Sequence, residues 1–217
     1  MERITPIFIK DFKGLADKDF RVLDTRTPGE FTGGFIPGSV FIGTGMQMEE
    51  WAKKLLSPSE PILLIASEDE PVETFKKLSN AGFKIKGFLE GGYKAWEQAG
   101  EKIDLIIDIE ADELALDIPF DPNLTVLDVR GYNEFAEGHL QNAINLPLEE
   151  MADIAQIADF EENQNIYIHS GSGYRSVIAA SLLKRQGYHN LRNVAGGWIE
   201  IKKQKGIAIQ KEAAKLN

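Results

Sequence analysis

The stretch that decides the fold is Ile166-Tyr-Ile-His-Ser-Gly-Ser-Gly-Tyr-Arg-Ser-Val-Ile-Ala-Ala-Ser-Leu-Leu-Lys-Arg-Gln-Gly187. The apolar run that ends at His169 predicts a short strand, and residues Ser176 to Gln186 predict a helix. Between them, Gly171 and Gly173 free the backbone to curl. Because the first amides of a helix have no partner within it, this strand, loop and helix predict a cradle for an anion.

The composition is that of a globular protein with one large or two small domains. Of the 217 residues, 43% are hydrophobic and 27% are charged, which is ordinary for a chain that buries a core. The net charge of -10 argues against nucleic acid or an acidic membrane as a partner. No apolar run approaches the ~20 residues of a membrane span, and no secretory signal follows Met1. We expect a cytoplasmic protein.

The chain contains no cysteine, which excludes disulfides, cysteine-rich metal sites and thiol chemistry by its own residues. The three histidines, His139, His169 and His189, lie far apart and form no i, i+4 pair. We therefore expect neither a metal site nor a cofactor.

The sequence contains two copies of one unit. The segment Val22-Leu-Asp-Thr-Arg26 is repeated 104 residues later as Val126-Leu-Asp-Val-Arg130. The segment Glu90-Gly-Gly-Tyr93 is likewise similar to Ala195-Gly-Gly-Trp198. Repeats of this size indicate two domains rather than a solenoid. We place the first domain at residues 1–100 and the second at residues 101–217.

Each repeat alternates strand and helix. In the second repeat, strands are expected at 103–109, 124–129, 143–145, 165–169 and 191–194, and helices at 132–137, 148–158, 176–186 and 197–205. This pattern predicts an α/β fold with a mostly parallel sheet and helices on both faces. Ligands of such sheets bind beyond the carboxyl ends of the strands, and Ser170 lies at such an end.

The loop from Ser170 to Arg175 resembles the active-site loop of rhodaneses, Cys-x-x-Gly-x-Arg, whose cysteine carries sulfane sulfur as a persulfide. Ser170 stands at the cysteine position. The Asp-x-Arg and Gly-Gly-aromatic landmarks of both halves are also similar to the rhodanese homology domain, so that the resemblance covers nearly the whole chain. It implies two rhodanese-like domains, each with a mostly parallel five-stranded sheet.

The resemblance also implies a reaction, in which sulfane sulfur passes from thiosulfate, mercaptopyruvate or a persulfide to a thiol acceptor or cyanide. Ser170 would hold the catalytic position, and the residues that bind the small sulfur-containing anion would be Gly171, Ser172, Gly173, Tyr174, Arg175 and Ser176. Related phosphatases use a loop one residue wider, which makes phosphate chemistry the less favoured class. Since a serine hydroxyl cannot replace a soft thiolate, we expect no turnover from this chain. Ser170 is either an engineered replacement or the residue of a natural pseudoenzyme.

Several roles stay open. Arg175 either binds the anion or pairs with a buried acid such as Asp128. The Asp-x-Arg pairs recur in both repeats and are interpreted as scaffold. His169 should face away from Ser170, because neighbouring side chains of a strand alternate, and His139 is interpreted as structural. Serine hydrolase activity is therefore disfavoured.

The first repeat has a different loop. After Ile62-Leu-Leu-Ile65 the chain runs through Ser67 to the carboxylates of Glu68, Asp69 and Glu70, and the loop is two residues shorter and lacks the glycines and the arginine. These carboxylates would repel an anion, so that we interpret the first domain as non-catalytic, with either a regulatory role or none beyond duplication. The alternative to a sulfurtransferase function for the whole chain is an anion-sensing or protein-binding regulatory module. Compact tandem rhodaneses also resemble the tails of persulfide dioxygenases, which suggests fusion or association with such an enzyme.

Overall fold

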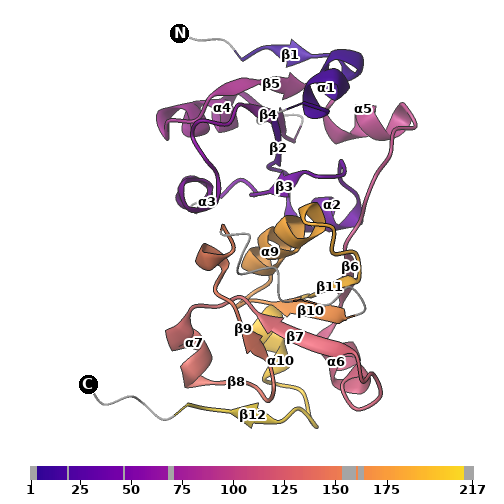
Figure 1. The fold of residues 1–217 in the computed structure, drawn as a ribbon, viewed down its shortest axis with the longest axis vertical. Coiled ribbons are helices and arrows are strands. Elements are labelled where there is room, and N and C mark those ends of the chain that lie inside the picture. Colours follow the sequence, from indigo (N-terminus) through magenta and orange to yellow (C-terminus); the bar gives the residue numbers. More distant parts are fainter. Residues whose placement is uncertain are drawn as a thin grey trace. The chain divides into compact units, whose positions relative to one another are not determined.

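The protein is described from a computed structural model, which describes residues 4–18, 20–45, 47–67, 71–152, 160 and 164–212. It divides into two compact units, Met1–Leu105 and Ile106–Asn217 (Figure 1). The expected division at residues 100 and 101 lies a few residues before this one. Asp104 forms an antiparallel bridge with Phe35 of the first unit, and the expected strand 103–109 is correspondingly shortened to Ile107–Ile109.

The first unit is built on a five-stranded parallel sheet in the order β1-β5-β4-β2-β3. Its central strand β4 is fully buried, which explains why its sequence, Ile62-Leu-Leu-Ile65, has no polar alternation. The strands are β1 Pro6–Ile7, β2 Arg21–Asp24, β3 Val40–Phe41, β4 Ile62–Ile65 and β5 Ile85–Leu89. The helices are α1 Ile9–Ala16, α2 Pro28–Gly33, α3 Met48–Leu55, α4 Pro71–Asn80 and α5 Gly92–Gln98.

The second unit repeats this topology in the order β6-β11-β10-β7-β9, again with all strands parallel. The predicted α/β fold with two five-stranded sheets is therefore confirmed. The sheet strands are β6 Ile107–Ile109, β7 Leu124–Asp128, β9 Ile144–Asn145, β10 Asn165–His169 and β11 Leu191–Val194, and a separate antiparallel pair joins β8 His139–Leu140 to β12 Ile209–Gln210. The helices are α6 Ala111–Asp117, α7 Tyr132–Glu137, the 3-10 helix η1 Leu148–Glu150, α9 Tyr174–Arg185 and α10 Gly197–Ile201.

Three predicted helices of the second unit differ at their ends. The helix expected from Ser176 begins at Tyr174, because Gly173 already takes the left-handed conformation (φ 105°) that precedes the first turn. The helix expected from Gly197 to Lys205 ends at Ile201. The helix expected at 148–158 opens as the 3-10 turn η1, and its residues 153–158 lie outside the described residues.

Candidate functional site

The loop 170–175 begins at the carboxyl end of β10, the strand that lies between β11 and β7 in the middle of the second sheet. Ser170 is 1% exposed. Its Oγ accepts a hydrogen bond from the amide of Gly173 at 3.2 Å, and its carbonyl accepts one from the amide of Trp198 at 2.7 Å. The loop therefore closes on itself and is held from behind by the first turn of α10.

The remaining predicted site residues follow around the same bend. Gly171 is half-buried and Ser172 is exposed at the tip. Ser176 is buried, and its hydroxyl donates to the carbonyl of Gly173 at 2.8 Å, which caps the bend at the start of α9. Tyr174 lies between them, and burial raises the pKa of its hydroxyl to about 12, so that it stays protonated at neutral pH.

Arg175 forms a bidentate ion pair with Glu134. Its Nη1 donates to Glu134 Oε2 and its Nη2 to Oε1, both at 2.7 Å. Glu134 Oε2 also accepts the amide of Gly131 at the start of α7, and the bond from Arg175 holds the pKa of the Glu134 carboxyl below its ordinary value. The arginine thus does fold onto an acid, but that acid is Glu134 and not Asp128, which is already paired with Arg130.

The Asp-x-Arg pair is part of the scaffold in both units. Arg130 binds Asp128 through its Nη2 at 2.6 Å, reaches the carbonyl of Gly138 at 2.8 Å and lies 4.5 Å from the ring centre of Trp198. Arg26 makes the same contacts to Asp24, to the carbonyl of Gly34 and to the ring of Tyr93. Since the first unit shares this arrangement and lacks the arginine-containing loop, the pair supports the fold and not one particular chemistry.

Neither nearby histidine is placed to activate Ser170. The Nδ1 of His169 lies 3.4 Å from the carbonyl oxygen of Ser170, and its Nε2 lies 3.5 Å from Asp128 Oδ2. Burial lowers the pKa of His169, so that the ring is neutral at neutral pH. His139 bonds the carbonyl of Phe135 and stacks on that ring. Within the described part of the chain, the Gly173 amide is the one hydrogen-bond partner of Ser170 Oγ, and this hydroxyl has no general base.

Gly197 lets the first turn of α10 approach the loop. Its φ is 56°, and a β-carbon there would collide with the carbonyl oxygen of Ser170. We expect Gly197→Ala to lower the unfolding free energy of the second unit by about 2–4 kcal/mol, from backbone strain and overpacking together.

The matched control is Gly187→Ala in the same unit, because Gly187 has a φ of 94° but open space where its β-carbon would lie. It should lose only the ~1–2 kcal/mol of the left-handed backbone. Urea unfolding of both variants measures the difference. Equal losses would show that the contact with Ser170 is not what requires a glycine.

A cavity of about 540 Å³ lies beside the loop and touches it at Gly171, with Glu134, Trp198 and Lys202 among its lining residues. Neither Glu134 nor Lys202 is among the site residues predicted from the sequence. Glu134 could have been found, because it is the third residue of α7 and repeats Glu30 of the first unit, which marks both as helix-capping positions. No sequence signal marked Lys202 as a site residue, because the helix expected at 197–205 placed it inside a helix. In the structure α10 ends one residue before it, at Ile201.

A family model described as rhodanese-like domain matches residues 9–99 and 110–204. The chain therefore belongs to the rhodanese-like domain family. It is 33% identical over 104 residues to the "Putative sulfur carrier protein YrkF" of Bacillus subtilis, which covers 48% of this chain and 55% of that protein. It is 31% identical over 87 residues to the "Adenylyltransferase and sulfurtransferase UBA4" of Candida glabrata, which covers 36% of this chain and 20% of that protein.

Among solved structures, the rhodanese-like domain protein of Staphylococcus aureus is 26% identical with a TM-score of 0.43, over 49% of this chain and all of that one. The chain covers less than two thirds of the length of YrkF and of UBA4. In the part of the chain that the structure describes, no helix is long and apolar enough to cross a membrane.

Proposed function

We propose that the second unit is a rhodanese-type sulfurtransferase scaffold whose loop 170–175 binds a small sulfur-containing anion. The observation that carries this proposal is the placement of Ser170 at the end of β10 with its Oγ on the amide of Gly173, at the N-terminus of the 12-residue helix α9. A cysteine thiolate at this position would be stabilised by the same amide and by the positive end of the helix.

The chemistry that the scaffold would support is transfer of one sulfur atom in two steps. In a cysteine form, the thiolate attacks the sulfane sulfur of thiosulfate, the S–S bond of the donor breaks, and sulfite leaves with the electron pair. The resulting persulfide is attacked at its outer sulfur by an acceptor thiolate or cyanide, which restores the cysteine thiolate. Ser170 cannot begin this sequence, because its hydroxyl is neither soft nor deprotonated. We therefore expect no turnover while serine occupies this position.

The direct test is Ser170→Cys, assayed with thiosulfate or mercaptopyruvate as donor and cyanide or glutathione as acceptor. Sulfur transfer that appears in this variant supports the proposal. Absence of transfer with every donor from a folded variant would contradict it.

The alternative is a regulatory module that binds an anion without turning it over, since Ser170 removes turnover but leaves Arg175 in the loop. Glu134 occupies the guanidinium of Arg175, so that an incoming anion would have to displace this carboxylate. We expect the unmodified chain to bind sulfite or thiosulfate and Arg175→Ala to weaken this binding about tenfold or more, by removing a charge-assisted bidentate contact. Calorimetric titration measures it.

The control for this titration is Arg185→Ala, which removes an exposed arginine from the last turn of α9. If both variants lose affinity equally, the anion responds to net charge rather than to the loop. If the chain bound a partner protein but no anion, only the proposal of a protein-binding module would stand.

Two finer proposals concern partners. The sequence of the first unit has neither glycine nor arginine at residues 66–70, which follow β4, whereas loop 170–175 contains both, and we propose that the first unit is non-catalytic and regulates the second. The likeness of tandem rhodaneses to the tails of persulfide dioxygenases supports such an enzyme as fusion or binding partner. The product or the protein surface of the dioxygenase would then reach loop 170–175. Co-purification of this chain with a persulfide dioxygenase would test the association.

A further inference from the structure

The cavity of about 540 Å³ beside the loop has a lining that the proposed function does not use. Residues of α7, α10 and β12 line it, and it touches the loop at Gly171. Thiosulfate and cyanide have only a few non-hydrogen atoms, so that neither fills a space of this size, which is typical of a pocket for a larger organic ligand. The cavity therefore has room for a sulfur acceptor longer than cyanide.

One part of the cavity is apolar and adjoins the loop. Trp198 and Ile209 meet beside Gly138, where a β-carbon would lie 3.3 Å from Trp198 Cζ2 and 4.0 Å from Ile209 Cγ2. Ile199 also lines the cavity, and its amide donates to the carbonyl of Gly171 at 3.2 Å. The side chains of Ile199 and Ile209 are 47% and 42% exposed. This surface suits the carbon chain of an organic ligand that reaches the loop.

Two cationic side chains also line the cavity. Lys202 lies four residues after Trp198, which places it on the same face one turn further along, and Lys211 directly follows β12. Both lysines are exposed. Neither side chain has a hydrogen bond or an ion pair with a residue that the structure describes. Their ammonium groups are therefore available to an anionic ligand.

The other charges of the lining leave a net positive charge. Arg130 is paired with Asp128, and Glu134 is paired with Arg175. Among the described lining residues, Glu137 at the end of α7 is the one carboxylate without an ion pair, and it offsets one of the two lysines. The cavity therefore suits a ligand group that carries a single negative charge.

The chain beyond Lys211 adds little opposing charge. Glu212 lines a neighbouring cavity of about 510 Å³ and does not line this one. Residues 213–217 lie outside the described residues, and their sequence contains a lysine and no acidic side chain. The segment that follows β12 is thus compatible with an anion in the cavity.

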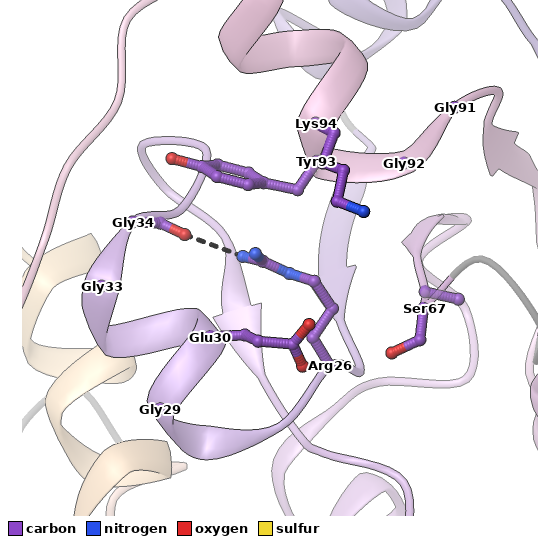
Figure 2. A pocket seen from close by; sticks show the side chains of 11 residues that line it. Arg26, Gly29, Glu30, Gly33, Gly34, Ser67, Gly91, Gly92, Tyr93 and Lys94 are labelled. Atoms are coloured by element: carbon purple, nitrogen blue, oxygen red, sulfur yellow. Dashed lines mark hydrogen bonds between the residues drawn. The ribbon is translucent and has the colours of Figure 1, made fainter.

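The first unit has a different residue at the place of each lysine. Figure 2 shows Arg26 and Tyr93 at its corresponding cavity, which has a volume of about 410 Å³. Tyr93 packs on Arg26 as Trp198 packs on Arg130, so that the two aromatic residues correspond. Four residues further on, the first unit has Glu97 where the second has a lysine.

The second lysine has no counterpart either. The antiparallel bridge of Phe35 with Asp104 corresponds to the pairing of β8 with β12, and the residue after Asp104 is Leu105 where the second unit has Lys211. The two lysines therefore belong to the unit whose loop contains the glycines and the arginine.

We propose that this cavity binds the carboxylate of an organic thiol that accepts sulfur at the loop, an inference that rests on the proposed function. The carboxylate lies between Lys202 and Lys211, and the carbon chain lies on Trp198. The thiol reaches the loop at Gly171. In a cysteine form, the acceptor thiolate attacks the outer sulfur of the persulfide, the S–S bond breaks, and its electron pair returns to the cysteine sulfur. The acceptor leaves as a persulfide.

The first test is an NMR titration of the unmodified chain with 3-mercaptopropionate. We expect saturable shifts at the amides of Lys202 and Ile209. The uncharged thiol 2-mercaptoethanol should bind about tenfold more weakly, because it loses two exposed charge contacts that are each worth about threefold. Shifts confined to Ser172 and Tyr174 would place the carboxylate in the loop instead. That result, absence of shifts at millimolar ligand, or equal binding of both thiols would overturn the proposal.

Variants in the Ser170→Cys chain assign the contacts. Lys202→Gln and Lys211→Gln should each raise KM for 3-mercaptopropionate about threefold, and together about tenfold, with KM for 2-mercaptoethanol unchanged. Glu137→Gln should lower KM for 3-mercaptopropionate about threefold, because it removes the opposing charge. The matched control is Lys205→Gln, an exposed lysine outside the lining. An equal rise of KM in this control would show a response to net charge and overturn the proposal.

The two tests separate this inference from the proposed function. If Ser170→Cys transfers sulfur and the lysine variants leave KM for 3-mercaptopropionate unchanged, the acceptor site is wrong and the sulfurtransferase scaffold stands. If Ser170→Cys transfers no sulfur to any acceptor, the acceptor role fails together with the proposed function, even where the titration shows a bound carboxylate.

Discussion

Ser170→Cys is expected to convert a chain without sulfurtransferase turnover into one that transfers sulfur from thiosulfate to cyanide. The gain should be on the order of 10³-fold or more over the serine chain, because removing a nucleophile from a prepared site costs at least that much in kcat. The replacement is nearly isosteric, and the buried position already gives Ser170 Oγ an amide donor at 3.2 Å. The assay is thiocyanate formation under saturating thiosulfate.

The expected form of the pH dependence follows from the same contact. A free cysteine has a pKa of about 8.5, and an amide donor together with a helix N-terminus lowers it. The rate should therefore reach its plateau well below pH 8.5 rather than rise through it. A plateau reached only above that pH would mean that α9 and the Gly173 amide do not stabilise the thiolate.

The matched control is Ala66→Cys, which places a thiol directly after β4, at the position of the first unit that corresponds to Ser170 because Ile65 pairs with Asp24 as His169 pairs with Asp128. This thiol lacks the glycine-containing loop and the arginine, and we expect it to stay at background. Mass spectrometry after incubation with thiosulfate should find one added sulfur atom on Cys-substituted position 170 and none on position 66. Equal labelling of both positions would show that thiol chemistry alone, without the cradle, explains any activity.

The sequence was sufficient for the strands and for the place of the loop, because both follow from local pattern. The buried run before Ser170 and the glycines after it leave few other conformations, and β7, β10 and β11 are found where apolar runs predicted them. The partner of Arg175 could not be found in this way. Glu134 and Asp128 are both acids near the loop, and the choice between them depends on Arg130 having already occupied Asp128, which is a tertiary contact.

Helix ends were less predictable for the same reason. The 3-10 turn η1 contains Glu149 and Glu150, residues with good intrinsic helix propensity, and what fixes its conformation is the bond from the Leu148 amide to the carbonyl of Val129. The antiparallel pair of β8 and β12 joins residues far apart in the chain, and each strand has only two residues. Strands this short have no periodic signal to read.

Asp128→Ala is expected to have the largest effect on stability. Asp128 and Arg130 have side chains 0% and 3% exposed, so that removing the carboxylate leaves a buried guanidinium without its counter-charge. The unfolding free energy of the second unit should fall by about 3–5 kcal/mol. Hydrogen exchange at the amides of β7 and β10, measured as a function of urea, reports on this unit. Asp24→Ala should destabilise the first unit to a similar extent, because Asp24 and Arg26 are paired in the same way.

A double variant separates the effect of the two buried charges from the effect of side-chain volume. In Asp128→Leu with Arg130→Met, neither charge remains, and most of the lost stability should return, because apolar residues of similar size can replace a buried ion pair. Lys203→Ala, which breaks the exposed pair with Glu200, should change the unfolding free energy by less than about 1 kcal/mol. If the double variant were as unstable as Asp128→Ala, its loss would come instead from the contacts that Arg130 makes with the carbonyl of Gly138 and the ring of Trp198. Arg130 would then act as a hydrogen-bonded brace between α7 and α10, and its pairing with Asp128 would only make its burial tolerable.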